Sequence, residues 1–202
     1  MNTALVVFAK APLPGYAKTR LVPALGEKGA AQLAERLLQH TLARALAADT
    51  GPVELCVAPS SRLECWQGLP DGIQLSEQGE GDLGARMARV AQRSIAATGR
   101  VILIGTDCPS LGVDQLQAAA RALNSSDCVM VPAKDGGYVL LGLNRFSNEL
   151  FTAIPWSTDR VAALTRERIA TLGWSLQELA PLHDIDEPED LIHLPDALTP
   201  RD

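Results

Sequence analysis

The sequence lacks the positive charge of a general nucleic-acid binder and the cysteine spacing of a zinc-binding protein. Its 24 acidic side chains outnumber 18 basic ones, so the net charge of the 202 residues is −6. A general nucleic-acid binder needs a net positive face, so this balance argues against that class. The four cysteines include no C-x-x-C pair of the kind that binds zinc, and a chain of this length does not need disulfides to fold. We therefore expect reduced thiols.

The sequence also lacks a long apolar run near its N-terminus. The run at residues 4–9 is short, and Lys10 ends it. A signal peptide has a longer apolar core behind positive residues, and a membrane-spanning helix needs about 20 apolar residues. We therefore expect no membrane association and a cytoplasmic location. What is present is an ordinary globular balance, with 47% apolar residues in a chain that suits one compact domain.

Strand patterns and helix patterns alternate along the chain. Short apolar or β-branched runs predict buried strands, and apolar residues at helical spacing predict helices. The expected strands cover residues 4–10, 53–58, 72–78, 100–107, 128–133, 137–143 and 174–180. The expected helices cover residues 27–48, 83–95, 113–123 and 158–172.

Two of the expected strands are too close in sequence to be parallel neighbours. The strand at 137–143 follows the strand at 128–133 almost at once. A parallel crossover needs a dozen residues or more, so we expect 137–143 to run antiparallel in an otherwise parallel sheet. The predicted fold is a three-layer α/β sandwich with a mostly parallel mixed sheet. One domain is expected over residues 1–195, followed by a loose tail at 196–202.

Unusual side chains follow several of the expected strands. In open α/β sheets, ligands bind beyond the carboxyl ends of the strands. The segments found there are "KAPLPGYAKTR" (10–20), "GEGDLGARM" (79–87), "GTDCPSL" (105–111), "KDGGY" (134–138) and "HDIDEPEDL" (183–191). We expect these five segments to meet at one edge of the sheet and to form a ligand site there.

The first segment is a loop that contains Gly15 and leads into a helix. Such a loop can offer backbone N–H groups to phosphate. Lys10, Lys18 and Arg20 would add charge-assisted hydrogen bonds to two or three phosphates. An ordinary solvated loop is the alternative, because the pattern is neither a Walker loop nor G-x-G-x-x-G.

The second segment supplies glycines on which a flat group such as a nucleobase could lie. Gly81, Asp82 and Arg86 are therefore candidate nucleotide-binding residues. Asp82 is also expected to cap the following helix. A plain loop-to-helix turn explains this segment at least as well.

Three aspartates are candidate metal ligands. Asp107 directly follows a fully apolar strand, where its carboxylate suits a hard cation such as Mg²⁺ or Mn²⁺. Asp184 and Asp186 are two residues apart, so in an extended segment both would face the same side and could complete the coordination. Structural roles are the alternatives, because Asp107 could form an Asx turn and Asp186 or Glu187 could start a helix.

Together, the segments "AKAPLPGYAKTRL", "GDLGARM", "IGTDCPSL", "AKDGGYVLLGL", "PWST" and "DIDEPEDL" resemble those of a known family. The chain is similar to the bacterial glycosyltransferases associated with arsenosugar biosynthesis, within the nucleotide-diphospho-sugar transferase superfamily. The resemblance covers about residues 4–194. Single motifs are shared with guanylyltransferases that act on phospholactate or phosphoenolpyruvate, and with molybdenum-cofactor nucleotidyltransferases.

The resemblance implies a GT-A type, Rossmann-like fold and a nucleotide-linked donor. It implies donor-phosphate contacts for the basic residues of the first loop and metal ligation by the three aspartates, with the acceptor near Gly136 and Gly137. Trp156 in "PWST" lies close to the proposed site, and Trp156 and Ser157 are candidate acceptor-binding residues, although a tryptophan is more often part of the core. In one departure, Glu187 stands where relatives commonly have Thr in D-x-D-T-P-E-D-L.

Two reactions and one binding role fit these residues. In glycosyl transfer from a nucleotide sugar, a neutral hydroxyl of a small-molecule acceptor attacks, and Asp135 or His183 could act as general base. In nucleotidyl transfer from an NTP, an anionic acceptor needs no base but needs cations, and mainly Lys134 and Arg160 are available. This shortage favours glycosyl transfer. Asp135 could equally form a turn with Gly136. A nucleotide-binding module without activity is the third hypothesis, and it would not require the distant metal carboxylates. Self-association is left open.

Overall fold

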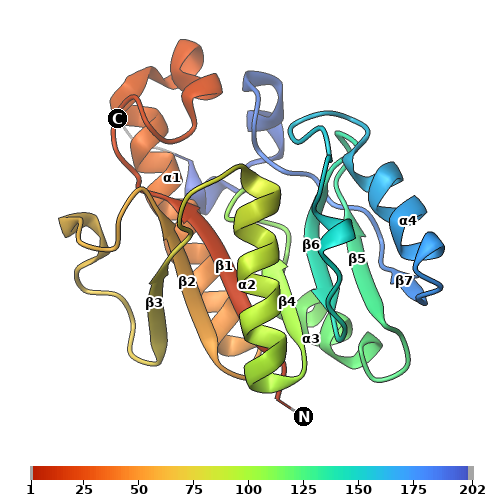
Figure 1. The fold of residues 1–202 in the computed structure, drawn as a ribbon. Helices are drawn as coiled ribbons and strands as arrows, with labels where there is room; N and C mark the ends of the chain where they lie inside the picture. Colours follow the sequence, from red (N-terminus) through yellow and green to blue (C-terminus); the bar gives the residue numbers. More distant parts are fainter. Residues whose placement is uncertain (1, 200–202) are drawn as a thin grey trace.

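The computed structural model describes residues 2–199, which form three layers (Figure 1). One face of a central sheet packs against helices α1 (Val22–Ala47) and α3 (Val113–Ala122). The other face packs against α2 (Leu83–Thr98) and α4 (Val161–Thr171). The predicted three-layer α/β sandwich is therefore confirmed.

Seven strands form one sheet within the described residues. They are β1 (Ala4–Lys10), β2 (Val53–Ala58), β3 (Ile73–Glu77), β4 (Val101–Ile104), β5 (Cys128–Pro132), β6 (Tyr138–Leu143) and β7 (Leu176–Glu178). Their spatial order is β3-β2-β1-β4-β6-β5-β7. Strand β6 runs antiparallel to both of its neighbours, and the other neighbouring pairs are parallel. The prediction of one antiparallel strand at 137–143 is confirmed.

Strand β1 shows why the central strands are continuously apolar in sequence. It lies between β2 and β4, and both of its faces are covered by helices. Because successive side chains of a strand point to opposite faces, Leu5 and Val7 join the core under α1 and α3, whereas Val6 joins the core under α2. The strand therefore needs apolar residues at every position.

Helix α1 packs against the sheet and also against the loop after β1 and the C-terminal segment. Near its start, Gly26 has φ 69° and ψ 167°, which interrupts the helical geometry. Regular helical geometry therefore begins at about residue 27, where the sequence predicts the helix to start. Leu33 and Leu37 on this helix are fully buried in a cluster with Leu21 and Ile185. This cluster joins the loop after β1 to the C-terminal segment.

Two element boundaries expose side chains at the carboxyl edge of the sheet. Strand β4 ends at Ile104, earlier than the predicted 100–107, so Asp107 lies beyond the last residue of the strand. Helix α2 begins after Asp82, whose carboxylate accepts a hydrogen bond of 2.8 Å from the backbone N–H of Ala85. This confirms the predicted N-cap.

The C-terminal tail corrects one expectation. Asp196–Leu198 form a short 3-10 helix, and Leu194 and Leu198 are buried in the cluster with α1. Arg36 also donates a hydrogen bond to the carbonyl oxygen of Thr199. The prediction of a loose tail is wrong for residues 196–199, because two separated leucines anchor the chain without a helical pattern. Residues 200–202 lie outside the described part.

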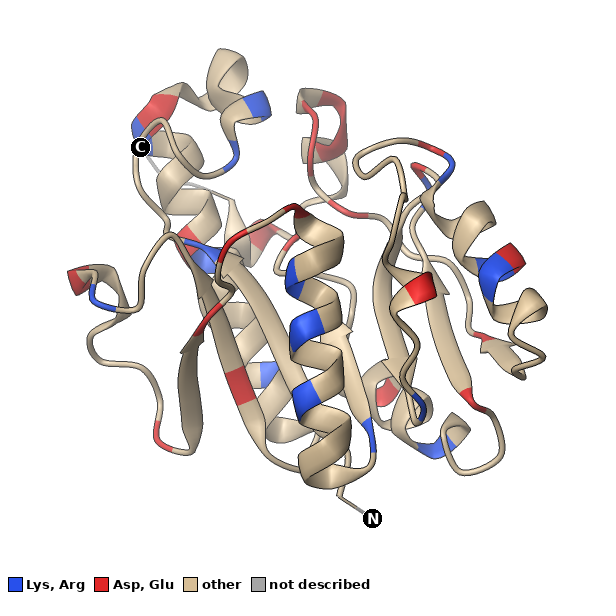
Figure 2. Cartoon of the chain, viewed as in Figure 1, with Lys and Arg blue, Asp and Glu red and all other residues tan. Residues whose placement is uncertain are grey.

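Acidic and basic residues are concentrated on different elements of the fold (Figure 2). Acidic positions are concentrated in the C-terminal segment above the sheet, and basic positions lie along α2 and in the loop after β1. None of the helices in residues 2–199 is both long enough and apolar enough to cross a membrane.

Candidate active site

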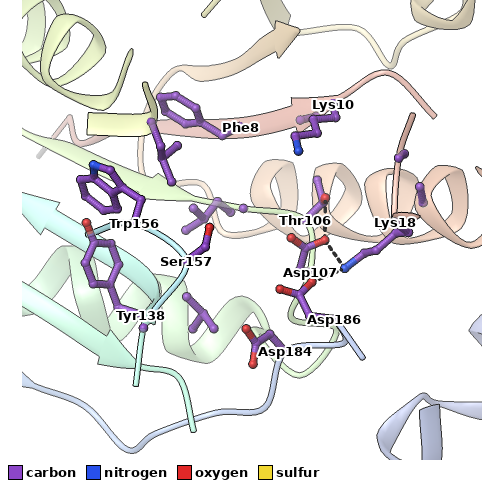
Figure 3. Close-up of a pocket in the computed structure, with 18 of the residues that line it drawn as sticks. Phe8, Lys10, Lys18, Thr106, Asp107, Tyr138, Trp156, Ser157, Asp184 and Asp186 are labelled. Carbon is purple, nitrogen blue, oxygen red and sulfur yellow. Dashed lines mark hydrogen bonds and ion pairs between the residues drawn. The ribbon is translucent and has the colours of Figure 1, made fainter. Parts of the chain in front are cut away.

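A cavity of about 460 Å³ opens at the carboxyl edge of β1 and β4 (Figure 3). Its walls combine the end of β1 and the following loop, the start of α2, the residues after β4, the turn before β6, the loop before α4 and the C-terminal segment. Four of the five segments expected at this edge each contribute at least one predicted site residue to the cavity. The cavity is the candidate active site.

The ammonium group of Lys18 lies between two of the predicted metal ligands. Lys18 Nζ is 2.5 Å from Asp107 Oδ1 and 2.8 Å from Asp186 Oδ1, and it also donates a hydrogen bond to the carbonyl oxygen of Ile185. The Lys18 side chain is only 7% exposed, whereas those of Asp107 and Asp186 are 45% and 38% exposed. The lysine is therefore buried beneath carboxylates that reach the cavity (Figure 3).

Backbone contacts hold the C-terminal segment in this position. The N–H of Ile185 donates a hydrogen bond of 2.8 Å to the carbonyl oxygen of Asp107, and the Ile185 side chain is fully buried. One carboxylate oxygen of Asp190 accepts hydrogen bonds from the N–H groups of Asp186, at 2.9 Å, and Glu187, at 2.7 Å. These contacts keep Asp184 and Asp186 on the side of Ile185 that faces the cavity.

The charges of this cluster change two pKa values. Burial alone would lower the pKa of Lys18, but the adjacent Asp107 and Asp186 carboxylates outweigh it and raise that pKa above its ordinary value. Burial raises the pKa of Asp184 to about 6, and the nearby Asp135, Asp186 and Asp107 add to the shift. Asp184 thus lies in an environment that disfavours its negative charge, and a bound cation would relieve this.

The donor set fits a divalent cation that also binds substrate. Within residues 2–199, no group of three or more His, Cys, Asp and Glu side chains is arranged to hold a metal ion alone. Mg²⁺, however, is usually held by one or two carboxylates together with substrate phosphates and water. Asp107 and Asp186 already meet at one cationic group, so they could supply such a pair. The three-aspartate ligand set stays a prediction.

The other basic residues of the first loop also line the cavity. Lys10, at the end of β1, is exposed, and Arg20 forms an ion pair of 3.1 Å with Glu187. Glu187 is the residue that departs from the family pattern. It occupies the N-cap position of the 3-10 helix Pro188–His193, and its carboxylate pairs with Arg20. Positive charge in the cavity therefore comes from the β1 side.

Asp135 and its turn line the cavity from the segment before β6. One Asp135 oxygen accepts a hydrogen bond of 2.8 Å from the N–H of Gly137, as the turn reading predicts. Both residues line the cavity, so forming the turn does not remove the carboxylate from it. Gly136 does not line the cavity. It has φ 92°, and a Cβ there would lie 2.2 Å from the carbonyl oxygen of Asp159.

Aromatic side chains form part of the wall beyond this turn. Tyr138 and Trp156 lie near each other, with Ser157 between them and the carboxylate cluster in the view of Figure 3. The Tyr138 hydroxyl and the Trp156 indole N–H are buried and have no hydrogen-bond partner in the structure. Burial raises the pKa of the Tyr138 hydroxyl, so it stays protonated at neutral pH. This wall is mainly apolar, with hydroxyl groups at its edge.

Sequence comparison shows the family of the chain. A family model described as "Uncharacterized protein conserved in bacteria (DUF2064)" matches residues 41–158. The chain belongs to this family. The matched region includes Asp107, Asp135 and Trp156, whereas the loop of Lys18 and the C-terminal aspartates lie outside it. A comparison with curated proteins finds no match.

Solved structures share the fold of this DUF2064 member. A protein from Desulfovibrio desulfuricans G20, provisionally described as a nucleotide-diphospho-sugar transferase, is 29% identical, with a TM-score of 0.85 over 93% of this chain and 84% of that one. The 4-diphosphocytidyl-2C-methyl-D-erythritol synthase from Anaerococcus prevotii DSM 20548 is 10% identical, with a TM-score of 0.63 over 95% and 94%. A CMP:2-keto-3-deoxy-manno-octonic acid synthetase in complex with CTP is 12% identical, with a TM-score of 0.61 over 96% of each chain.

Several candidate residues lie outside the cavity wall and have other contacts. Arg86 donates hydrogen bonds to the carbonyl oxygen of Gly81 and to the side chain of Gln78, and Asp82 caps α2. These contacts order the loop before α2. Gly15 has φ 72°, which suits a turn in the first loop. The structure therefore assigns local structural contacts to Gly81, Asp82 and Arg86.

His183 also lies outside the cavity wall. Its ring stacks on that of His193 with 4.1 Å between the ring centroids. The neighbouring Asp184 is on the cavity side of the extended segment. Of the two candidate bases, Asp135 lines the cavity and His183 does not.

Three residues that help to form the site were not predicted individually from the sequence: Tyr138, Asp190 and Phe8. Tyr138 follows directly after the glycine turn, so its place in "DGGY" could have indicated it. Asp190 orders the C-terminal aspartates, and its spacing from Glu187 is that of a capping box. Phe8 lines the cavity although it belongs to β1, and its apolar neighbours give no separate signal.

Proposed function

We propose that the protein is a metal-dependent glycosyltransferase that moves a sugar from a nucleotide-linked donor to a neutral, hydroxyl-bearing small molecule. The observation that carries this proposal is the division of charge in the cavity. Lys10, Lys18 and Arg20 line it from the end of β1 and the following loop, with the two proposed metal ligands Asp107 and Asp186 beside Lys18. Asp135 and Asp184 line it from the turn before β6 and the C-terminal segment. A polyanionic donor and an uncharged acceptor match these two sides.

On the donor side, the chain offers charge-assisted hydrogen bonds to phosphate. Lys10 and Arg20 have exposed side chains, so their nitrogen atoms can reach a diphosphate without a change of fold. Asp107 and Asp186 would hold Mg²⁺ or Mn²⁺ together with the donor phosphates. When bound, the cation would stabilise the negative charge that develops on the departing nucleoside diphosphate.

On the acceptor side, the absence of positive charge supports a neutral nucleophile. Among the described residues, neither Lys134 nor Arg160 lines the cavity. An anionic acceptor would therefore meet Asp135 and Asp184 without a lysine or arginine on that wall to balance them. A hydroxyl group has no charge to balance, but its attack benefits from a general base.

Asp135 is the proposed general base. One of its oxygens accepts the Gly137 N–H, which fixes the orientation of the carboxylate. Its other oxygen can accept the proton of an acceptor hydroxyl. Tyr138, Trp156 and Ser157 would bind the body of the acceptor beside it.

Nucleotidyl transfer from an NTP is the second candidate. Three basic residues on the donor side could pair with a triphosphate as well as with a diphosphate. One structure with a similar fold contains CTP. That reaction requires a cationic acceptor wall, which this cavity does not have among its described residues.

A panel of nucleotide sugars and NTPs, each with and without Mn²⁺, tests the proposal by thermal shift. We expect the largest Mn²⁺-dependent rise in melting temperature with one nucleotide sugar. Stabilisation by an NTP alone would favour nucleotidyl transfer. Stabilisation by nucleotides without any effect of Mn²⁺ would favour a binding module. Mass spectrometry of a reaction with the selected donor and candidate hydroxyl acceptors then identifies a glycosylated product.

A further inference from the structure

The Lys18 ammonium already has three partners within the protein. It donates hydrogen bonds to Asp186 Oδ1 and to the carbonyl oxygen of Ile185, and it forms an ion pair with Asp107 Oδ1. A lysine ammonium has three N–H groups and no more. Lys18 therefore cannot make the predicted phosphate contact and keep all three observed partners at the same time.

The Lys18 ammonium also occupies the position that a bound divalent cation would take. The ammonium carries a positive charge between two carboxylates, at the point where a divalent ion held by the same two carboxylates would have to bind. The Lys18 side chain is 7% exposed, so its charge is little screened by water. Lys18 also has a left-handed backbone (φ 50°, ψ 41°), which residues other than glycine rarely adopt. The surrounding contacts thus fix an uncommon conformation that directs this side chain toward the carboxylates.

We propose that Lys18 is an internal competitor of the divalent cation: its ammonium holds Asp107 and Asp186 together until a cation with its nucleotide displaces it toward the donor phosphates. This inference rests on the proposed function, since it takes the two aspartates as the ligands of the cation. The lysine side chain has four rotatable bonds, so Nζ can move without the backbone. Lys18 lines the same cavity in which the donor phosphates are proposed to bind.

This exchange would couple the binding of cation and nucleotide. A cation alone has to displace Lys18, whose ammonium then loses its two carboxylate partners. When nucleotide is present, its phosphates accept hydrogen bonds from the displaced ammonium. Each ligand therefore raises the affinity for the other by the same factor, as linkage requires. Lys18 therefore makes the cavity bind cation and nucleotide together in preference to the cation alone.

Binding of Mn²⁺ alone tests the proposal without measuring activity. Isothermal titration calorimetry, or the electron paramagnetic resonance signal of free Mn²⁺, gives the affinity of the wild type and of Lys18→Met in the absence of nucleotide. We expect Lys18→Met to bind Mn²⁺ more tightly by about 5–150-fold, the usual range of coupling between sites. Asp107→Asn in the Lys18→Met background should abolish the gain.

Lys10→Met is the matched control, because it removes the same charge from the wall of the same cavity. Its Mn²⁺ affinity should change much less than that of Lys18→Met. Lys18→Gln, which keeps a polar side chain, serves if the methionine variant does not fold, and it carries the same expectation. Circular dichroism verifies that each variant is folded.

Unchanged or weaker Mn²⁺ binding by folded Lys18→Met or Lys18→Gln would overturn the proposal, because Lys18 would then only position the aspartates. An equal gain in Lys10→Met would also overturn it, since general charge would explain the effect. The thermal-shift panel with wild-type protein tests the proposed function separately. Nucleotide sugars can therefore bind with Mn²⁺ even if Lys18 does not compete.

Discussion

The backbone N–H of Ile185 donates a hydrogen bond of 2.8 Å to the carbonyl oxygen of Asp107. This contact joins the C-terminal segment to the chain just after β4, and the buried Ile185 side chain strengthens it by packing with Leu21, Leu33 and Leu37. Asp184 and Asp186 flank Ile185 and reach the cavity for this reason. The acidic part of the site therefore depends on an apolar contact behind it.

Ile185→Ala should lower the free energy of unfolding by about 2–5 kcal/mol, because it removes a fully buried aliphatic side chain. It should also weaken Mn²⁺-dependent nucleotide binding, since the adjacent aspartates lose their support. Urea unfolding and calorimetry measure the two effects.

Ile192→Ala is the matched control for this change. Ile192 belongs to the same segment, but its side chain is 83% exposed. Its substitution should change the free energy of unfolding by no more than about 0.5 kcal/mol. Equal losses in the two variants would contradict the anchoring role of Ile185.

Asp135→Asn should lower turnover by about 10²–10⁴-fold, the usual contribution of a general base. Asparagine keeps the side-chain oxygen that accepts the Gly137 N–H, so the turn before β6 should persist. Donor affinity should stay within a few-fold of the wild type. Steady-state kinetics and donor titration separate the two quantities. Normal turnover, or a large loss of donor binding, would argue against Asp135 as the base.

Asp184 should make the folded protein less stable as the pH rises. Burial and the nearby Asp135, Asp186 and Asp107 raise the pKa of Asp184 to about 6, whereas an unfolded chain has an aspartate pKa of about 3.9. Between these values the folded state binds more protons, so this group lowers the free energy of unfolding as the pH increases. The loss is complete above the folded pKa.

Asp184→Asn removes this charge and should therefore stabilise the protein at pH 7.5 in the presence of a chelator. The advantage over the wild type should shrink as the pH falls through 6 and disappear near the unfolded pKa. Urea unfolding over this pH range measures the difference. A difference that does not vary with pH would show that the charge of Asp184 is not its cause.

The sequence predicts the fold of the sheet well because the relevant signals are local. Strand β2 has the predicted bounds, since its apolar run is short and sharply delimited. The antiparallel direction of β6 follows from the brevity of the turn that contains Asp135. Asp82 caps α2 as predicted, because capping involves residues only a few positions apart.

The contacts of the site depend on parts of the chain that are distant in sequence. Nothing next to Lys18 indicates that its ammonium meets Asp107 and Asp186, because that contact depends on how the loop after β1 and the C-terminal segment pack. The burial of Leu198 likewise depends on packing in a cluster with Leu33 and Leu37 of α1, which are far from it in sequence. His183 and Asp184 are adjacent in sequence, yet only Asp184 lines the cavity.

We propose above all that a cation held at Asp107 links the protein to a nucleotide-linked donor. Calorimetric titration of wild-type protein and Asp107→Asn with the selected nucleotide sugar, with and without Mn²⁺, tests it most directly. Asparagine retains the shape of the side chain and an oxygen for the Thr106 contact, but it removes the negative charge.

We expect Mn²⁺ to strengthen donor binding to the wild type and to have little effect on Asp107→Asn. The loss of Mn²⁺-dependent turnover should be at least about 100-fold, or about 3 kcal/mol. The variant should remain folded, with a small decrease in melting temperature because Lys18 keeps Asp186 as a partner. Mn²⁺-dependent donor binding that is as strong in Asp107→Asn as in the wild type would contradict the account.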